Sequence, residues 1–100
     1  MVRKRIGLFV CPGIQALDLV GPMDAFAAAT MTTGDSQTSC YELVTIGLTQ
    51  QPVPAGSGLR LVPDHRIQDA PRLDTLLIPG GSGSIFRTLA LSGPVAQPPW

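Results

Sequence analysis

A single carboxylate, Asp18, stands between two leucines just after a long apolar run. The run and the turn that follows it belong to the stretch LFVCPGIQALDLVGPMDAF, residues 8 to 26. A carboxyl group beside the end of a buried strand can hold or move a proton for a bound reactant. Asp is also common as a cap of turns and helices, so a role for Asp18 in the backbone alone remains open. The flanking sequence favours a role in a site.

The two cysteines, Cys11 and Cys40, match neither a metal-binding spacing nor a disulfide framework. We therefore expect no metal site, and two reduced thiols. Cys11 ends the apolar run and is expected to be a small buried hydrophobic residue rather than a nucleophile. His65 follows Pro63 and Asp64 and is expected on the surface.

A second chemically suggestive stretch is the glycine-rich turn Gly80-Gly81-x-Gly83. Such a turn can bring backbone N–H groups close to a ligand. The dinucleotide-binding fingerprint would require glycine where Phe86 stands, so a plain tight turn is favoured over a phosphate loop. No cofactor is expected.

Strands and helices must position these groups, and their order indicates an α/β protein. Residues 6 to 11 form a continuous apolar run, which is typical of a strand covered on both faces in a parallel sheet. Pro22 suits the first position of a helix that continues to Ala29. Further strands are expected at 41 to 48, 59 to 62 and 73 to 78, and a second helix at 84 to 91. Polar or Pro/Gly-rich loops are expected at 12 to 21, 32 to 39, 50 to 58 and 69 to 72.

This order predicts an open, mostly parallel, flavodoxin-like sheet with helices on both faces. The runs 6 to 11 and 76 to 78 are expected side by side as buried parallel strands, because each ends at a Pro-Gly turn. Ligands of such sheets bind outside the carboxyl ends of the strands, so the loops 12 to 21 and 79 to 84 are the expected site.

The composition is that of a small globular domain or part of one. The chain has 100 residues, of which 44% are hydrophobic, and seven basic residues balance seven acidic ones. These values argue against disorder and against a polyanionic partner. No apolar stretch is long enough to span a membrane, and Pro12-Gly13 interrupts any signal-peptide pattern. We expect a cytoplasmic protein that does not associate with membranes.

Two segments together resemble the ThiJ/PfpI superfamily, whose fold is that of class I glutamine amidotransferases. They are LFVCPGIQALDLVGPMDAF and LDTLLIPGGSGS, and the resemblance covers residues 4 to about 91. The stretch SGLRLVPDHRIQDAPRLDTLLIPGG resembles one branch, the N-terminal sensing domain of AraC-type transcriptional regulators. Isonitrile hydratase-like enzymes share nearly the same start. The resemblance thus implies either a ligand-sensing domain or a hydratase or amidase-like enzyme.

The resemblance also implies roles for particular residues. Asp18 occupies the place of the acid that reaches a reactive cysteine in the family's enzymes. Gly80 and Gly81 match the turn whose N–H groups face a developing oxyanion, and Gly13 joins them as a ligand-binding residue. For a regulator, the implied partners are a small-molecule ligand, DNA through a C-terminal domain absent here, and a second copy of the complete protein.

One departure from the family pattern limits the chemistry expected of this chain. The family's nucleophile follows the Pro-Gly-Gly loop by another helix and strand, and no cysteine occurs after Cys40. We therefore expect residues 1 to 100 to be the N-terminal portion of a single ThiJ/PfpI-like domain, truncated or frameshifted before the nucleophile and inactive alone.

Overall fold

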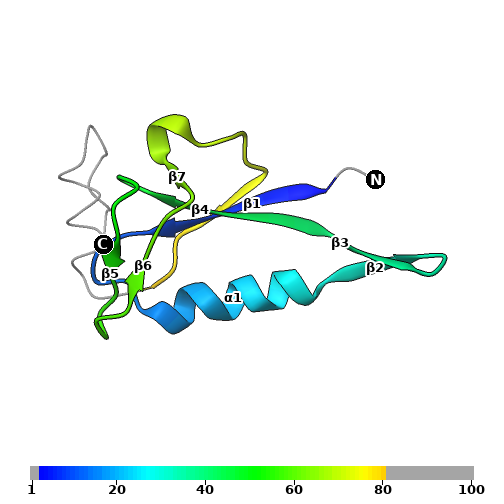
Figure 1. Ribbon diagram of the computed structural model, residues 1–100, viewed down its shortest axis with the longest axis horizontal. Helices are drawn as coiled ribbons and strands as arrows, with labels where there is room; N and C mark the ends of the chain where they lie inside the picture. The colour runs from blue at the N-terminus through cyan, green and yellow to red at the C-terminus, as the bar shows by residue number, and fades with distance from the viewer. Residues whose placement is uncertain (1–2, 81–100) are drawn as a thin grey trace, which may run out of the picture.

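The protein is built on a four-stranded sheet in which all neighbouring strands are parallel. The computed structural model describes residues 3–80. The strand order is β7-β4-β1-β8, from β7 (His65–Arg66), β4 (Tyr41–Gly47), β1 (Lys4–Val10) and β8 (Thr75–Leu77). The expected open parallel α/β sheet is thus confirmed (Figure 1). The predicted helix at 84 to 91 lies outside the described residues.

The central strand β1 is buried because its neighbours flank both edges and apolar groups cover both faces. Residues 6 to 11 all belong to the buried class, as the continuous apolar run predicted. One face contributes to a core that also contains residues from α1 (Ala16–Ala28) and from the β5 region. The buried members of that core are Ile6, Leu8, Val10, Ile14, Leu19, Val53 and Ala55.

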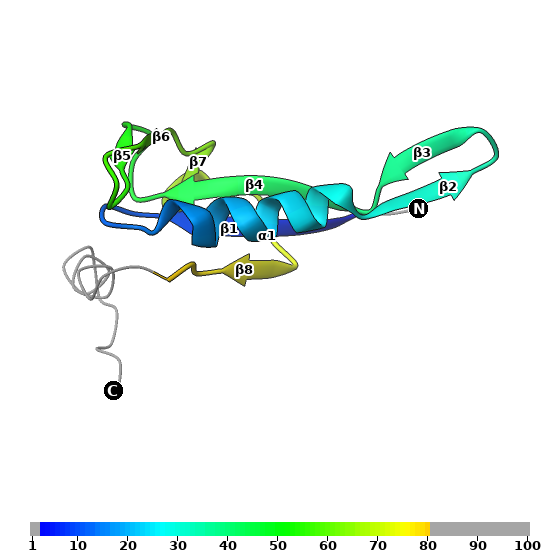
Figure 2. The ribbon, with the colours of Figure 1, turned by 90° about the horizontal axis from the view of Figure 1, so that it is seen from below.

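Helix α1 lies along one face of the sheet (Figures 1 and 2) and begins at Ala16 instead of at Pro22. The expected loop at 12 to 21 is therefore wrong for residues 16 to 21. A proline inside a helix removes a backbone hydrogen bond and normally breaks the helix. Here Leu19 is 2% exposed and packs into the core, so tertiary burial extends the helix across the proline.

The segment expected as a polar loop at 32 to 39 forms most of an antiparallel hairpin. Its strands are β2 (Thr30–Thr33) and β3 (Ser36–Ser39), and it projects beyond the end of α1 (Figure 2). Gly34 has a φ of 62° at the two-residue turn, a conformation that glycine adopts without steric cost. The polarity of this stretch concealed a hairpin that is exposed on both faces.

A second small antiparallel pair consists of β5 (Val53–Pro54) and β6 (Arg60–Leu61). The turns expected at 50 to 58 include β5, which was not predicted, and the expected strand at 59 to 62 shortens to two residues. After β7, a 3₁₀ helix (Ile67–Asp69) leads back across the sheet toward β8. No helix in residues 3–80 is long and apolar enough to cross a membrane.

The predicted pairing of β8 with β1 is confirmed, but the predicted burial of this strand is not. It pairs in parallel with β1, Leu77 opposite Leu8, as expected. The predicted burial of residues 76 to 78 is wrong, however: Leu76 in β8 is 48% exposed, and Ile78, which directly follows the strand, is 52% exposed. Among the described residues β8 is an edge strand, and no element covers the outer part of these two side chains.

Candidate functional site

The loop between β1 and α1 is shaped by backbone hydrogen bonds at the carboxyl end of the sheet. Ile14 N–H donates to the Cys11 carbonyl at 3.1 Å, which closes a tight turn. Gly13, in the middle of that turn, has a φ of 84°, a conformation that side chains rarely allow. Its N–H donates to the Pro54 carbonyl at 3.0 Å and joins the loop to β5.

Asp18 lies in the first turn of α1, close to the chain segment that follows β8. Gln15 N–H donates to the Gly80 carbonyl at 3.2 Å, which ties the helix start to that segment. A Cβ atom placed on Gly80 would lie 2.9 Å from Oδ2 of Asp18. The contact therefore requires glycine at position 80, or a shift of the carboxylate. Two of the predicted site residues, Asp18 and Gly80, are thus brought together.

The surroundings of Asp18 differ from those the sequence suggested. Asp18 is helical instead of lying in a loop, and its side chain is exposed instead of enclosed by leucines. The Asp18 backbone N–H donates to the Gln15 carbonyl, while no side-chain hydrogen bond within residues 3–80 uses its carboxylate. An acid in the first helical turn is favourable for the helix dipole. Among residues 3–80, no side-chain hydrogen bond occupies either carboxylate oxygen.

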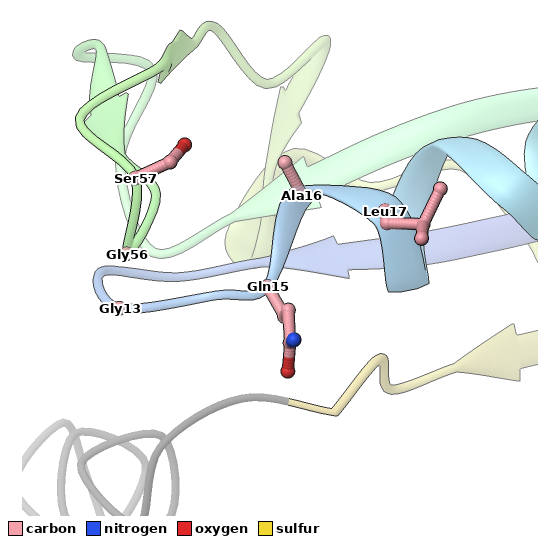
Figure 3. A pocket seen from close by; sticks show the side chains of 6 residues that line it. All are labelled: Gly13, Gln15, Ala16, Leu17, Gly56 and Ser57. Atoms are coloured by element: carbon pink, nitrogen blue, oxygen red, sulfur yellow. The ribbon is translucent and has the colours of Figure 1, made fainter.

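Next to Asp18, an open depression of about 480 Å³ lies between the start of α1 and the β5–β6 turn. Its lining residues are Gly13, Gln15, Ala16, Leu17, Gly56 and Ser57 (Figure 3). None of these carries a charge. Figure 3 shows the Gln15 side chain directed toward the segment after β8, away from Ser57. The depression is therefore a shallow groove with separate polar groups.

Of the lining residues only Gly13 was predicted as a site residue; Gln15, Ala16 and Leu17 lie within the loop 12 to 21 expected at the site, and Gly56 and Ser57 were not predicted at all. Gly56 N–H donates to the Ile14 carbonyl at 2.8 Å, so the β5–β6 turn is held against the loop after β1. The contact joins residues that are about forty positions apart, and no local pattern signals it. Of the predicted residues, Gly13 lines this groove, Asp18 and Gly80 lie beside it, and Gly81 is outside the described residues.

Neither thiol is placed to act as a nucleophile at this site. Cys11 is 0% exposed, and burial raises the pKa of its thiol to about 11, so it is protonated at neutral pH. Cys40 directly precedes β4, at the amino end of the sheet, opposite the groove. Both cysteines are free, as expected. No group of three potential metal ligands occurs in the described part of the chain.

His65 departs modestly from its prediction. It was expected on the surface of a loop, but it is half-buried in β7, where it is the register partner of Ile46. It lies on the outermost strand of the described sheet, two strands away from β1.

The fold defines an open parallel α/β domain, and the candidate groove lies at the carboxyl ends of its strands. The family model of the DJ-1/PfpI family matches residues 4–91, so the chain belongs to this family. The resemblance read from the two motifs is confirmed, and with it the flavodoxin-like fold.

The chain is similar to three proteins of known name or structure. An isonitrile hydratase of Pseudomonas putida is 38% identical over 79 residues, which are 79% of this chain and 31% of that protein. A ThiJ/PfpI family protein of Pseudomonas syringae has a TM-score of 0.73 at 26% identity, over 90% of this chain and 34% of its own. An AraC family transcriptional regulator of Pseudomonas putida has a TM-score of 0.60 at 20% identity, over 87% of this chain and 56% of its own. The last comparison establishes a shared fold alone, and the chain spans about a third of the hydratase.

Proposed function

We propose that residues 1 to 100 are the N-terminal portion of a single DJ-1/PfpI domain that binds a small molecule, as the sensing domain of an AraC-type transcriptional regulator. In this proposal the ligand occupies the groove between α1 and the β5–β6 turn. The complete protein would be a cytoplasmic homodimer and would contact DNA only through a C-terminal domain absent from this sequence.

The observation that carries the proposal is the exposed Asp18 carboxylate, which lies against Gly80 and has no side-chain hydrogen bond within residues 3–80, beside a groove whose lining residues in the described part of the chain are uncharged and include no cysteine. Such a site can accept hydrogen bonds from a ligand and orient it. The chain has no cysteine beyond Cys40, so its own residues support binding rather than thiol catalysis. In this proposal Gly13, Gly80 and Gly81 let the ligand approach the backbone, because glycine has no side chain.

A second candidate is an enzyme of the isonitrile hydratase type, and the 38% identity to such an enzyme favours it. In that case a cysteine outside this sequence would be the nucleophile. Asp18 would hold a proton for that thiol, and backbone N–H groups at Gly80 and Gly81 would stabilise an oxyanion. One such donor typically contributes about 3–4 kcal/mol to the transition state.

The test is Asp18→Asn in the complete protein, with Asp24→Asn as the matched control. Both residues are exposed acids of α1, but only Asp18 contacts Gly80. The measurements are ligand-induced shifts in melting temperature, from a panel of small neutral compounds, and turnover of an alkyl isonitrile.

A sensing domain predicts no turnover in the parent and a ligand response that Asp18→Asn weakens and Asp24→Asn retains. An enzyme predicts turnover that falls by about 10²–10⁴-fold in the Asp18 variant, since Asn cannot exchange a proton. Unchanged binding and turnover in both variants would remove Asp18 from the site.

A further inference from the structure

At the end of the sheet opposite the groove, charged side chains gather around the amino ends of three strands. The amino ends of β1, β4 and β8 lie toward the C-terminal end of α1, on the right in Figure 2. They surround an open depression of about 310 Å³, separate from the groove already described. Its lining residues are Arg3, Arg5, Glu42, Arg72 and Asp74.

Arg5 is the fixed centre of this cluster. Its Nε donates to Oε2 of Glu42 at 2.9 Å, and its Nη1 donates to the Arg72 carbonyl at 2.9 Å. The Arg5 backbone N–H donates to Oδ2 of Asp74 at 2.8 Å, and Asp74 N–H returns a bond to the Arg5 carbonyl at 2.9 Å. These bonds hold the segment before β8, and with it the backbone of Arg72, beside β1.

The charges around the depression do not balance. Three guanidinium groups face two carboxylates, which leaves one excess positive charge; Glu42 pairs with the Arg5 guanidinium, and Asp74 accepts from the Arg5 backbone N–H. Within residues 3–80, Arg3 and Arg72 form no ion pair. The depression is thus lined by two guanidinium groups without a carboxylate of their own. The planar fork of a guanidinium matches the oxygens of a phosphate or carboxylate group.

We propose that this depression binds a small oxyanion, a phosphate or carboxylate group, held between Arg3 and Arg72 with Arg5 as the rigid base. The site is at the other end of the sheet from the proposed ligand groove, and it does not depend on the function assigned there. The phosphate or carboxylate group can come from a free metabolite or from a side chain or terminus of another protein.

The first experiment titrates inorganic phosphate, then acetate, into the full chain at constant ionic strength and follows backbone amide resonances. Saturable shifts confined to the amides that surround the depression are expected. Arg72→Gln should raise the dissociation constant about tenfold, the effect of one charge-assisted bidentate contact. The Arg72 carbonyl that anchors Arg5 is retained in this variant, and Arg3→Gln provides a second, independent test.

Lys4→Gln is the matched control because it also removes one positive charge, at the position between Arg3 and Arg5 in the chain. Successive side chains of a strand point to opposite faces, and Lys4 does not line the depression. It should bind phosphate like the parent. Loss of affinity in Lys4→Gln equal to that in Arg72→Gln would show general electrostatic attraction and overturn the proposal. Absence of saturable shifts in the parent would also overturn it.

If the site binds phosphate, an acidic peptide and a phosphate monoester then distinguish the two sources. Competition by the monoester alone indicates a metabolite, and competition by the peptide alone indicates a protein partner. Failure of both to displace phosphate would contradict a site of this chemistry. None of these outcomes depends on Asp18, so this proposal and the proposed function fail independently.

Discussion

The buried thiol of Cys11 makes the stability of this chain depend on alkaline pH in a way that can be measured. Cys11 directly follows the central strand β1 and is 0% exposed, packed with Phe9 and Leu48. Burial disfavours the charged thiolate, which raises the pKa of the thiol from 9.0 to about 11 in the folded protein. The unfolded chain has no such penalty.

The sign follows from the proton that each state holds. Below pH 9 the thiol is protonated in both states, so its contribution to the free energy of unfolding is constant. Between pH 9 and 11 the unfolded state releases the proton and the folded state keeps it, so stability falls as pH rises. The loss is about 1.4 kcal/mol at pH 10 and approaches about 2.7 kcal/mol above pH 11, at 1.36 kcal/mol per pKa unit.

Urea unfolding between pH 7 and pH 11 measures this loss when the parent is compared with Cys11→Ala. Other groups titrate in both proteins, so the difference between their pH profiles isolates the thiol. Cys11→Ala should be less stable at pH 7 and should lose less stability as the pH rises. Cys40→Ala, which keeps the buried thiol, should follow the parent. Parallel profiles for the parent and Cys11→Ala would refute the assignment of Cys11 as a buried, structural thiol.

Three further predictions concern how the sheet and helix α1 are held together. Asp74→Ala removes the acceptor that ties the start of β8 to β1, and should lower the free energy of unfolding by about 1–3 kcal/mol in urea unfolding. The control, Asp69→Ala, breaks an exposed ion pair and should lower it by at most about 1 kcal/mol. Equal losses of stability in the two variants would contradict the role given to Asp74. Gly47→Ala places a Cβ 2.5 Å from Cγ of Pro63 and should destabilise by about 1–3 kcal/mol. Gly21→Ala in α1 meets no atom within 4 Å and should stabilise by about 0.5–1 kcal/mol in the same assay; a destabilising effect there would show that the helix does not hold this residue as described.

Much of the architecture was accessible from local patterns in the sequence. The continuous apolar run at 6 to 11 predicted a strand buried on both faces, because alternation disappears only when both faces are covered. The order of strands and helices predicted the parallel sheet. Two apolar runs that each end at a Pro-Gly turn, together with the family's sheet, predicted the side-by-side placement of residues 6 to 11 and 76 to 78, and the structure pairs residues 6 to 8 with residues 75 to 77. Two ordered motifs identified the family, since their joint occurrence is far more specific than either alone.

Local rules failed where packing or turn geometry outweighed propensity. Pro22 signals a helix start, yet burial of Leu19 extends α1 back to Ala16. The Thr- and Ser-rich segment at 30 to 39 has the polarity of a loop, yet a two-residue turn at Gly34 folds it into a hairpin. Polarity reports exposure, and an exposed hairpin therefore looks like a loop in the sequence.

For the candidate site, the sequence by itself determined the chemical groups and the end of the sheet where they gather. Loops after parallel strands meet at one edge, which indicated the loops 12 to 21 and 79 to 84, and the family resemblance singled out Asp18 and Gly80 within or beside them. Only the tertiary structure decided that the carboxylate rests against Gly80, exposed and without a side-chain partner in residues 3–80. Only the tertiary structure, likewise, brought Gly56 and Ser57 to the loop after β1. The physical reason is that a strand or helix is encoded by residues near one another, whereas a site depends on contacts between distant segments that form when the chain packs.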